Sequence, residues 1–166
     1  AYTRTRYGTG YYIYHQFVPD APLSQPITRW DAETPPAHDV IELLAQSGQD
    51  LAPHPDTPEG KALGTQQLSG TAPVGAGTTS VLTTIESGPA MIRALDLSIS
   101  RDQAVALGTA RLRITWDGRT TASIDAPVAL FFGAGTLHNR ENQEYLVKGF
   151  PMVIRFDEER VHLSCY

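Results

Sequence analysis

An alternating segment followed by a tight-turn dipeptide constrains the fold of this chain more than any other feature. Apolar and polar side chains alternate in Thr109–Trp116, and the inward positions are Leu112, Ile114 and Trp116. A period of two predicts a strand with one face toward a core, because successive side chains of a strand point to opposite faces. Asp117-Gly118 follows at once and predicts a hairpin turn, with Ser123–Ala126 as the returning strand. The chain is therefore expected to build an antiparallel sheet with one buried face.

Further strands are predicted where β-branched and aromatic residues are concentrated. These segments are Tyr11–Phe17, Thr78–Ile85, Met91–Ser100, Val128–Phe132, Phe150–Phe156 and Arg160–Tyr166. A turn at Asp157-Glu158-Glu159 is expected to join the last two. The 14 glycines and 12 prolines in 166 residues punctuate the chain, which favours short strands over long helices.

One helix is predicted near residues 36–47. Thr34 is the candidate N-cap, Pro35 suits the first turn and Gly48 suits the stop. Its apolar stripe consists of Val40, Ile41, Leu43 and Leu44. Residues 48–64 are predicted to be a surface loop, and Asp102–Leu107 a helical turn. The predicted fold class is all-β, mostly antiparallel, as a jelly roll or β-sandwich with this one short helix.

Composition excludes several classes of function. The formal net charge is -5 and the pI about 5.4, which disfavours nucleic-acid binding by phosphate neutralisation. No apolar run approaches the roughly 20 residues of a membrane span. The single cysteine, Cys165, excludes an internal disulfide and a multi-thiolate metal site. The five histidines are scattered, and neither a metal nor a cofactor is predicted.

A polar segment at residues 137–144 is the candidate binding site. It follows the Gly133-Ala134-Gly135 break and combines imidazole, amide, guanidinium and carboxylate groups. The candidate residues are His138, Asn139, Arg140, Glu141 and Glu144. Such groups bind sugar hydroxyls, and sugar hydrolysis commonly uses two carboxylates. The alternative is a solvated loop.

Other candidates have simpler structural interpretations. Asp117 and Asp125 flank the predicted hairpin, where Asp117 is expected to form the turn. Five aromatic residues could stack on a sugar face: Trp30, Trp116, Phe131, Phe132 and Tyr145. Core packing is favoured, because Trp116 and the Phe pair alternate into the predicted core.

Four motifs follow one another in a fixed order: Gly88-Pro89-Ala90-Met91-Ile92, Leu112 through Gly118, Ser123 through Pro127, and Phe131 through Gly135. Their order resembles glycoside hydrolase family 172, first catalogued as a domain of unknown function. The family pattern runs G-P-G-x-I, W-D-G, P-S-V-x-x-P and D-F-F-G-x-G, so the resemblance lies mainly in residues 78–135. The matching positions, expected to determine the fold, are Gly88, Pro89, Trp116, Asp117, Gly118, Pro127, Phe131, Phe132 and Gly133.

The excess of arginine over lysine, with many Ala, Gly and Thr residues, favours a bacterial source. The resemblance implies an enzyme built from jelly rolls, usually two per chain and often a trimer. It also implies activity on arabinofuranosides or fructofuranosides by a retaining mechanism that uses two glutamates. The catalytic segments of the family, E-G-D-E and G-T-G-T-E-D-Y, do not occur here, and Leu130 and Ala122 replace an expected Asp and Pro. No catalytic residue is therefore assigned, and the catalytic pair is expected outside this chain. Glu141 and Glu144 are the residues expected to contact substrate.

Because the catalytic segments of the family are missing, the chain is not expected to be a complete enzyme. Residues 1–166 are expected to form a single jelly-roll domain, a fragment or one half of a two-jelly-roll protein. Its expected partners are a carbohydrate and either further copies of the chain or the remainder of a longer one. An extracellular or cell-envelope location is expected over a cytoplasmic one. The alternatives are a non-catalytic carbohydrate-binding jelly roll, a structural assembly domain, and a shell or appendage protein.

Overall fold

The computed structural model describes residues 14–29, 31 and 33–166, which fall into two units divided between Ala37 and His38. In the first unit, the described residues form loops and turns. The predicted strand Tyr11–Phe17 is not found at Tyr14–Phe17, which is a loop, and its residues 11–13 lie outside the described part, as does Trp30. Thr34 donates from its backbone N–H to Asp31 Oδ1 (2.6 Å) and from Oγ1 to Asp31 Oδ2 (2.7 Å). It therefore belongs to an Asp-centred turn and does not cap a helix.

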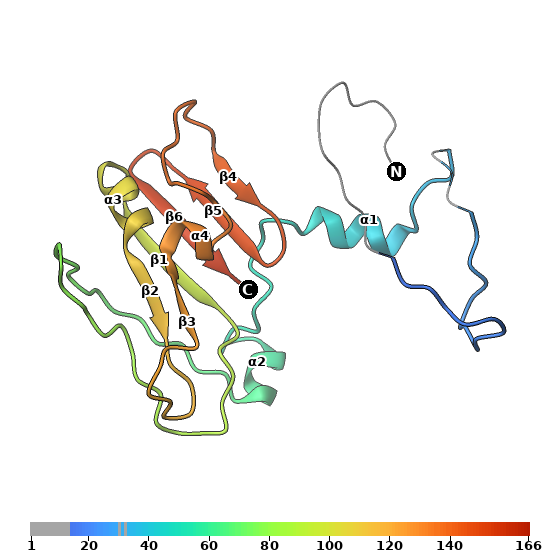
Figure 1. Cartoon of the computed structure of the whole chain (residues 1–166), viewed down its shortest axis with the longest axis horizontal. Coiled ribbons are helices and arrows are strands. Elements are labelled where there is room, and N and C mark those ends of the chain that lie inside the picture. The colour runs from blue at the N-terminus through green and yellow to red at the C-terminus, as the bar shows by residue number, and fades with distance from the viewer. Residues whose placement is uncertain (1–13, 30, 32) are drawn as a thin grey trace. The chain divides into compact units, whose positions relative to one another are not determined.

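The second unit is built on a four-stranded antiparallel sheet in the order β1-β6-β5-β4 (Figure 1). Its strands are β1 (Leu95–Ser100), β4 (Tyr145–Lys148), β5 (Met152–Phe156) and β6 (Arg160–Cys165). The register places Leu97 opposite Leu163, and Leu163 opposite Ile154. Alternate positions of three neighbouring strands thus form one apolar face. β4 was not predicted, since its four residues follow a polar segment without an alternating pattern of their own.

The predicted hairpin is confirmed as β2 (Arg111–Ile114) and β3 (Ile124–Pro127), which form a separate two-stranded antiparallel sheet. Asp117 and Gly118 both have left-handed backbones (φ 54° and 64°), the conformation that a tight Asp-Gly turn requires. Trp116 was predicted to point inward but is 39% exposed. The strand ends at Ile114, so Trp116 already belongs to the loop beyond the core.

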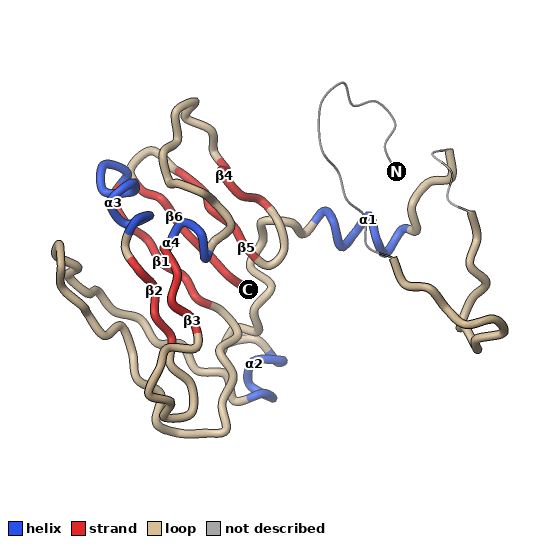
Figure 2. The backbone as a smooth tube through the Cα atoms, viewed as in Figure 1, coloured by secondary structure: helices blue, strands red, loops and turns tan. Residues whose placement is uncertain are grey.

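The core lies between the four-stranded sheet and a layer formed by the hairpin and two short helices (Figure 2). These helices are α3 (Ala104–Thr109), preceded by a 3₁₀ turn at Arg101–Gln103, and α4 (Val128–Phe131). Phe132, Leu137, Ile154, Leu163 and Val161 are the largest fully buried side chains. α3 confirms the helical turn predicted at Asp102–Leu107.

The strand predicted at Val128–Phe132 is wrong, because Val128–Phe131 form α4 and Phe132 is its C-cap. The backbone N–H of Phe132 donates to the carbonyl oxygen of Val128 (3.2 Å), and Gly133 (φ 90°) ends the turn in the left-handed region. A short continuous apolar run cannot be assigned to strand or helix by periodicity. The strand predicted at Thr78–Ile85 is wrong as well: this segment is an exposed loop, with no ladder partner among the described residues to satisfy its backbone.

Two helices precede the sheet among the residues that the structure describes. α1 (His38–Ala45) confirms the helix predicted near 36–47 with narrower limits, and its apolar stripe is exposed. α2 (Pro58–Leu63) corrects the surface loop predicted over 48–64. The Oγ1 atom of Thr57 caps it by accepting from the N–H of Gly60 (3.0 Å), and left-handed Gly64 (φ 66°) ends it.

The structure confirms the antiparallel β class with a few short helices. Neither sheet closes into a barrel or a complete sandwich, so the finer jelly-roll architecture is not established. None of the helices that the structure describes is long and apolar enough to cross a bilayer.

Candidate functional site

The candidate segment forms a loop between a buried anchor and a strand. Leu137 is 1% exposed and packs in the core, whereas the segment 138–144 is mostly exposed. The backbone carbonyl of Glu144 accepts a hydrogen bond from the N–H of Phe156 (2.7 Å), and β4 begins at the next residue. The loop is therefore fixed at one end by apolar packing and at the other by the sheet.

Asn139 gives the loop its shape. Its Nδ2 atom donates to the carbonyl oxygen of Gln143 (2.7 Å), and its Oδ1 atom accepts from the backbone N–H of the same residue (3.0 Å). Asn142 adopts a left-handed backbone (φ 51°) inside this ring, a conformation that asparagine tolerates better than most residues. The Asn139 amide is thus engaged within the loop.

The loop brings part of the candidate set together around a depression of about 170 Å³. Arg140 and Glu141 line it with Asn139, Gln143 and Leu146. Nε2 of Gln143 donates to Oε2 of Glu141 (2.9 Å), which orients this carboxylate. The depression therefore offers a guanidinium donor, a carboxylate acceptor and an apolar wall.

Two of the candidate residues do not line this depression. His138 donates its backbone N–H to Oγ1 of Thr136 (3.1 Å), and Glu144 contributes its carbonyl to the sheet. Both side chains are exposed. Gln143 and Leu146 were not singled out from the sequence, although Gln143 lies within the polar segment that was.

A second depression, of about 350 Å³, is lined by Asp157, Glu158, Glu159 and Arg160 in the β5–β6 turn. Oδ1 of Asp157 accepts from the backbone N–H groups of Glu159 (3.0 Å) and Arg160 (2.7 Å), while Oδ2 lies 2.6 Å from Nε2 of His162. The hydrogen bond from the Arg160 amide, followed by those from His162 and Glu159, lowers the pKa of Asp157 to about 2. The predicted turn is confirmed, and Asp157 is held as a carboxylate.

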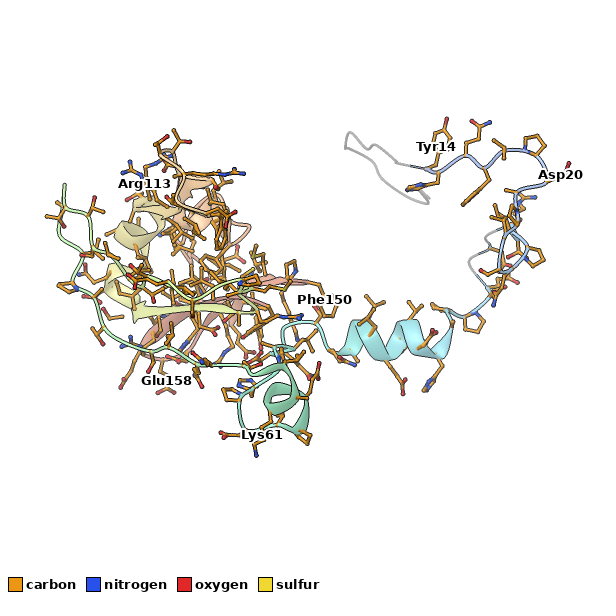
Figure 3. All side chains as sticks on the ribbon, turned by 90° about the horizontal axis from the view of Figure 1, so that it is seen from below. Tyr14, Asp20, Lys61, Arg113, Phe150 and Glu158 are labelled. Atoms are coloured by element: carbon orange, nitrogen blue, oxygen red, sulfur yellow. The ribbon has the colours of Figure 1, made fainter. Side chains whose placement is uncertain are left out.

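Asp125, one of the two carboxylates at the hairpin, has structural partners. Oδ1 of Asp125 accepts from Nε of Arg111 (2.6 Å), and Oδ2 lies 3.4 Å from Nε of Arg113. The Arg111 hydrogen bond, with the charge of both arginines, keeps the pKa of Asp125 below its usual value. In Figure 3, Arg113 and Glu158 project from opposite sides of the sheet region. The Asp125 carboxylate is thus engaged by the two arginines of β2.

Most of the motif residues occupy turns and packing positions. Phe131 and Phe132 pack edge to face, with ring centroids 5.0 Å apart and planes at 81°, and Phe132 is fully buried. A Cβ on Gly133 would lie 3.7 Å from Val147 of β4, besides being strained at its positive φ. Pro127 ends β3 and immediately precedes α4. Gly88 and Pro89 lie in an exposed loop.

No group of three or more histidine, cysteine, aspartate or glutamate side chains suited to a metal ion occurs among the residues described. The His162–Asp157 pair has no third ligand of these types in that part of the chain.

Comparison with protein families gives a match to the family described as GH172 domain-like over residues 64–158, more than half of the chain. The chain belongs to this family. No curated protein and no solved structure matches it. Membership in this family relates the chain to glycoside hydrolases. It also confirms the resemblance carried by the four motifs.

The match extends the resemblance beyond residues 78–135 and includes the whole loop at 138–144. It ends within the β5–β6 turn, whereas β6 occupies an interior position of the sheet and supplies buried Val161 and Leu163. The folded unit of this GH172 domain therefore requires residues beyond the matched region.

Proposed function

We propose that this chain is the carbohydrate-contacting domain of a bacterial glycoside hydrolase that acts on arabinofuranosides or fructofuranosides. The observation that carries the proposal is that the family match includes the loop where Arg140, Glu141 and Gln143 surround one depression. Carboxylate and guanidinium groups at such a position hydrogen-bond sugar hydroxyls. An extracellular or cell-envelope location belongs to the same proposal.

The proposed reaction is retaining hydrolysis or transfer. One carboxylic acid protonates the leaving oxygen, and a second carboxylate about 5 Å away attacks the anomeric carbon. This pair is proposed to lie outside the chain. Within it, Glu141 would accept a hydrogen bond from a sugar hydroxyl, and Arg140 would donate one to a ring or hydroxyl oxygen.

A second candidate function is assembly, either with further copies of the chain or with the rest of a longer protein. The four apolar residues of the α1 stripe are between 45% and 61% exposed. Five apolar residues of the loop leading into the sheet are exposed as well: Val81, Leu82, Ile85, Met91 and Ile92. Exposed apolar surface of this kind marks an interface.

A sugar titration tests the first proposal. The affinities of wild type, Glu141→Gln and Glu144→Gln for methyl arabinofuranosides and methyl fructofuranosides would be measured calorimetrically. We expect Glu141→Gln to lose about tenfold in affinity, because one hydrogen bond to a charged group contributes roughly 1.5–3 kcal/mol. A smaller loss is expected for Glu144→Gln, since Glu144 does not line the depression.

The matched control is Glu86→Gln, which removes the same charge from an exposed loop preceding the sheet. Equal affinities for wild type and Glu141→Gln would remove Glu141 from the site. A wild-type chain that binds neither class of furanoside would contradict the proposed function and leave assembly as the function to test.

A further inference from the structure

Arg101 connects the candidate loop to the β5–β6 turn. Its Nη2 atom donates to Oδ1 of Asn142 (2.8 Å), and its Nη1 atom donates to the carbonyl oxygen of Asp157 (2.7 Å). Its backbone N–H donates to the carbonyl oxygen of Glu159 (2.9 Å). Its guanidinium carbon lies 5.3 Å from the centroid of the Phe156 ring. One side chain therefore touches the loop, the turn and the end of β5 together.

The shape of the loop and its placement have different origins. Asn139 closes the ring of residues 139–143 from within. Within the described part of the chain, the bond from Arg101 to Asn142 is the hydrogen bond that ties residues 139–143 to another element. Losing it would leave the ring intact and held only at its two ends, by the packing of Leu137 and by the bond from the Phe156 N–H to the Glu144 carbonyl.

We propose that Arg101 is a positioning residue for the sugar-binding loop, holding the Glu141–Gln143 pair in place against the β5–β6 turn. The proposal rests on the proposed function for its ligand, a furanoside. Arginine suits this role because its planar fork serves two acceptors at once, which a lysine ammonium cannot do with the same geometry. A loop held in place before binding loses less conformational freedom when the sugar arrives.

Position 142 allows the contact to be removed without changing the backbone. Asn142 has φ 51°, and both glycine and aspartate accept that conformation. Asn142→Gly removes the Oδ1 acceptor, whereas Asn142→Asp retains it and adds a charge opposite the guanidinium. Arg101→Lys disrupts the same contact from the arginine side, because a lysine ammonium cannot serve both acceptors with the geometry of a guanidinium.

The test combines amide hydrogen exchange of residues 139–143 without sugar, furanoside affinity and melting temperature. We expect Asn142→Gly and Arg101→Lys to accelerate exchange in the loop and to weaken affinity about tenfold, because a loop without its tether must be ordered when the sugar binds. Asn142→Asp should keep loop exchange and furanoside affinity at the wild-type values. The melting temperatures of the two position-142 variants should match that of wild type, which separates positioning from general stability.

Unchanged loop exchange in Asn142→Gly would overturn the proposal, whatever the sugar result. Faster exchange with unchanged affinity would overturn it also, because the loop would then not need the tether for binding. If the wild-type chain binds no furanoside, the proposed function is contradicted and the loop has no assigned ligand. The exchange measurement still decides independently whether Arg101 tethers the loop.

Discussion

Asp157 organises the β5–β6 turn with both oxygens of its carboxylate. Two backbone amides donate to one oxygen, and the ring of His162 lies against the other. These contacts favour the ionised form and lower the pKa of Asp157 to about 2. The side chain therefore stabilises the folded state more when it is ionised than when it is protonated.

Asp157→Asn tests this contribution across pH. Because the folded pKa lies below the unfolded value, the stabilisation is fully present above about pH 4 and is lost as pH falls through about 2. Wild type should melt at a higher temperature than Asp157→Asn at about pH 5, and the difference should shrink toward about pH 2. Glu158→Gln, in the same turn, is the control. A difference that stays constant over this range would show that the charge of Asp157 has no role.

Individual side chains were predictable where a local rule applied. Asp117 and Gly118 follow from turn chemistry alone, and Leu112 follows from alternation. Leu137 did not, because one apolar residue in a polar segment carries no period. Arg101 did not either, since its partner Asn142 is 41 residues away and only the folded sheet brings the two together.

At the scale of elements, strands that alternate and end in a turn were predicted, whereas continuous apolar or threonine-rich runs were not assigned correctly. β1 and β6 have regular apolar faces that pair in register. Val128–Phe131 became a helix, since four apolar residues have no decisive period. Thr78–Ile85 has strand propensity but no partner in the described part of the chain, and a strand requires a partner for its hydrogen bonds.

α1 carries an apolar stripe that no other element of the described structure covers. Its stripe of Val40, Ile41, Leu43 and Leu44 is exposed. We expect the chain to self-associate through this stripe and the double substitution Ile41→Glu, Leu44→Glu to weaken association at least about tenfold, or 1.4 kcal/mol. Association weakens because two carboxylates would have to be buried in an apolar contact. Sedimentation velocity over a range of concentrations measures the effect.

Glu42→Gln changes a charge on the opposite face of the same helix and should leave association unchanged, because residue 42 does not adjoin the stripe. A wild-type chain that stays monomeric at high concentration would contradict self-association, and the rest of a longer protein would then be the partner to test.

At the scale of the molecule, composition correctly limited the chain to an acidic β-rich protein, and the order of four motifs identified its family. The family match over residues 64–158 covers the loop but not β6. Glycoside-hydrolase relatedness is established on this basis, and contact with a furanoside is the central proposal. The glutamate motifs are missing, so the chain has proposed sugar-binding groups and no assigned catalytic pair.

Amide chemical-shift mapping during titration with methyl arabinofuranoside and methyl fructofuranoside tests that proposal most directly. It reports where on the chain a sugar binds without depending on hydrolysis. We predict saturable shifts concentrated in residues 138–146, with weaker shifts at Arg101 and in the turn at residues 157–160. Saturable shifts confined to the hairpin loop around Trp116, or no shifts with either sugar, would contradict the account.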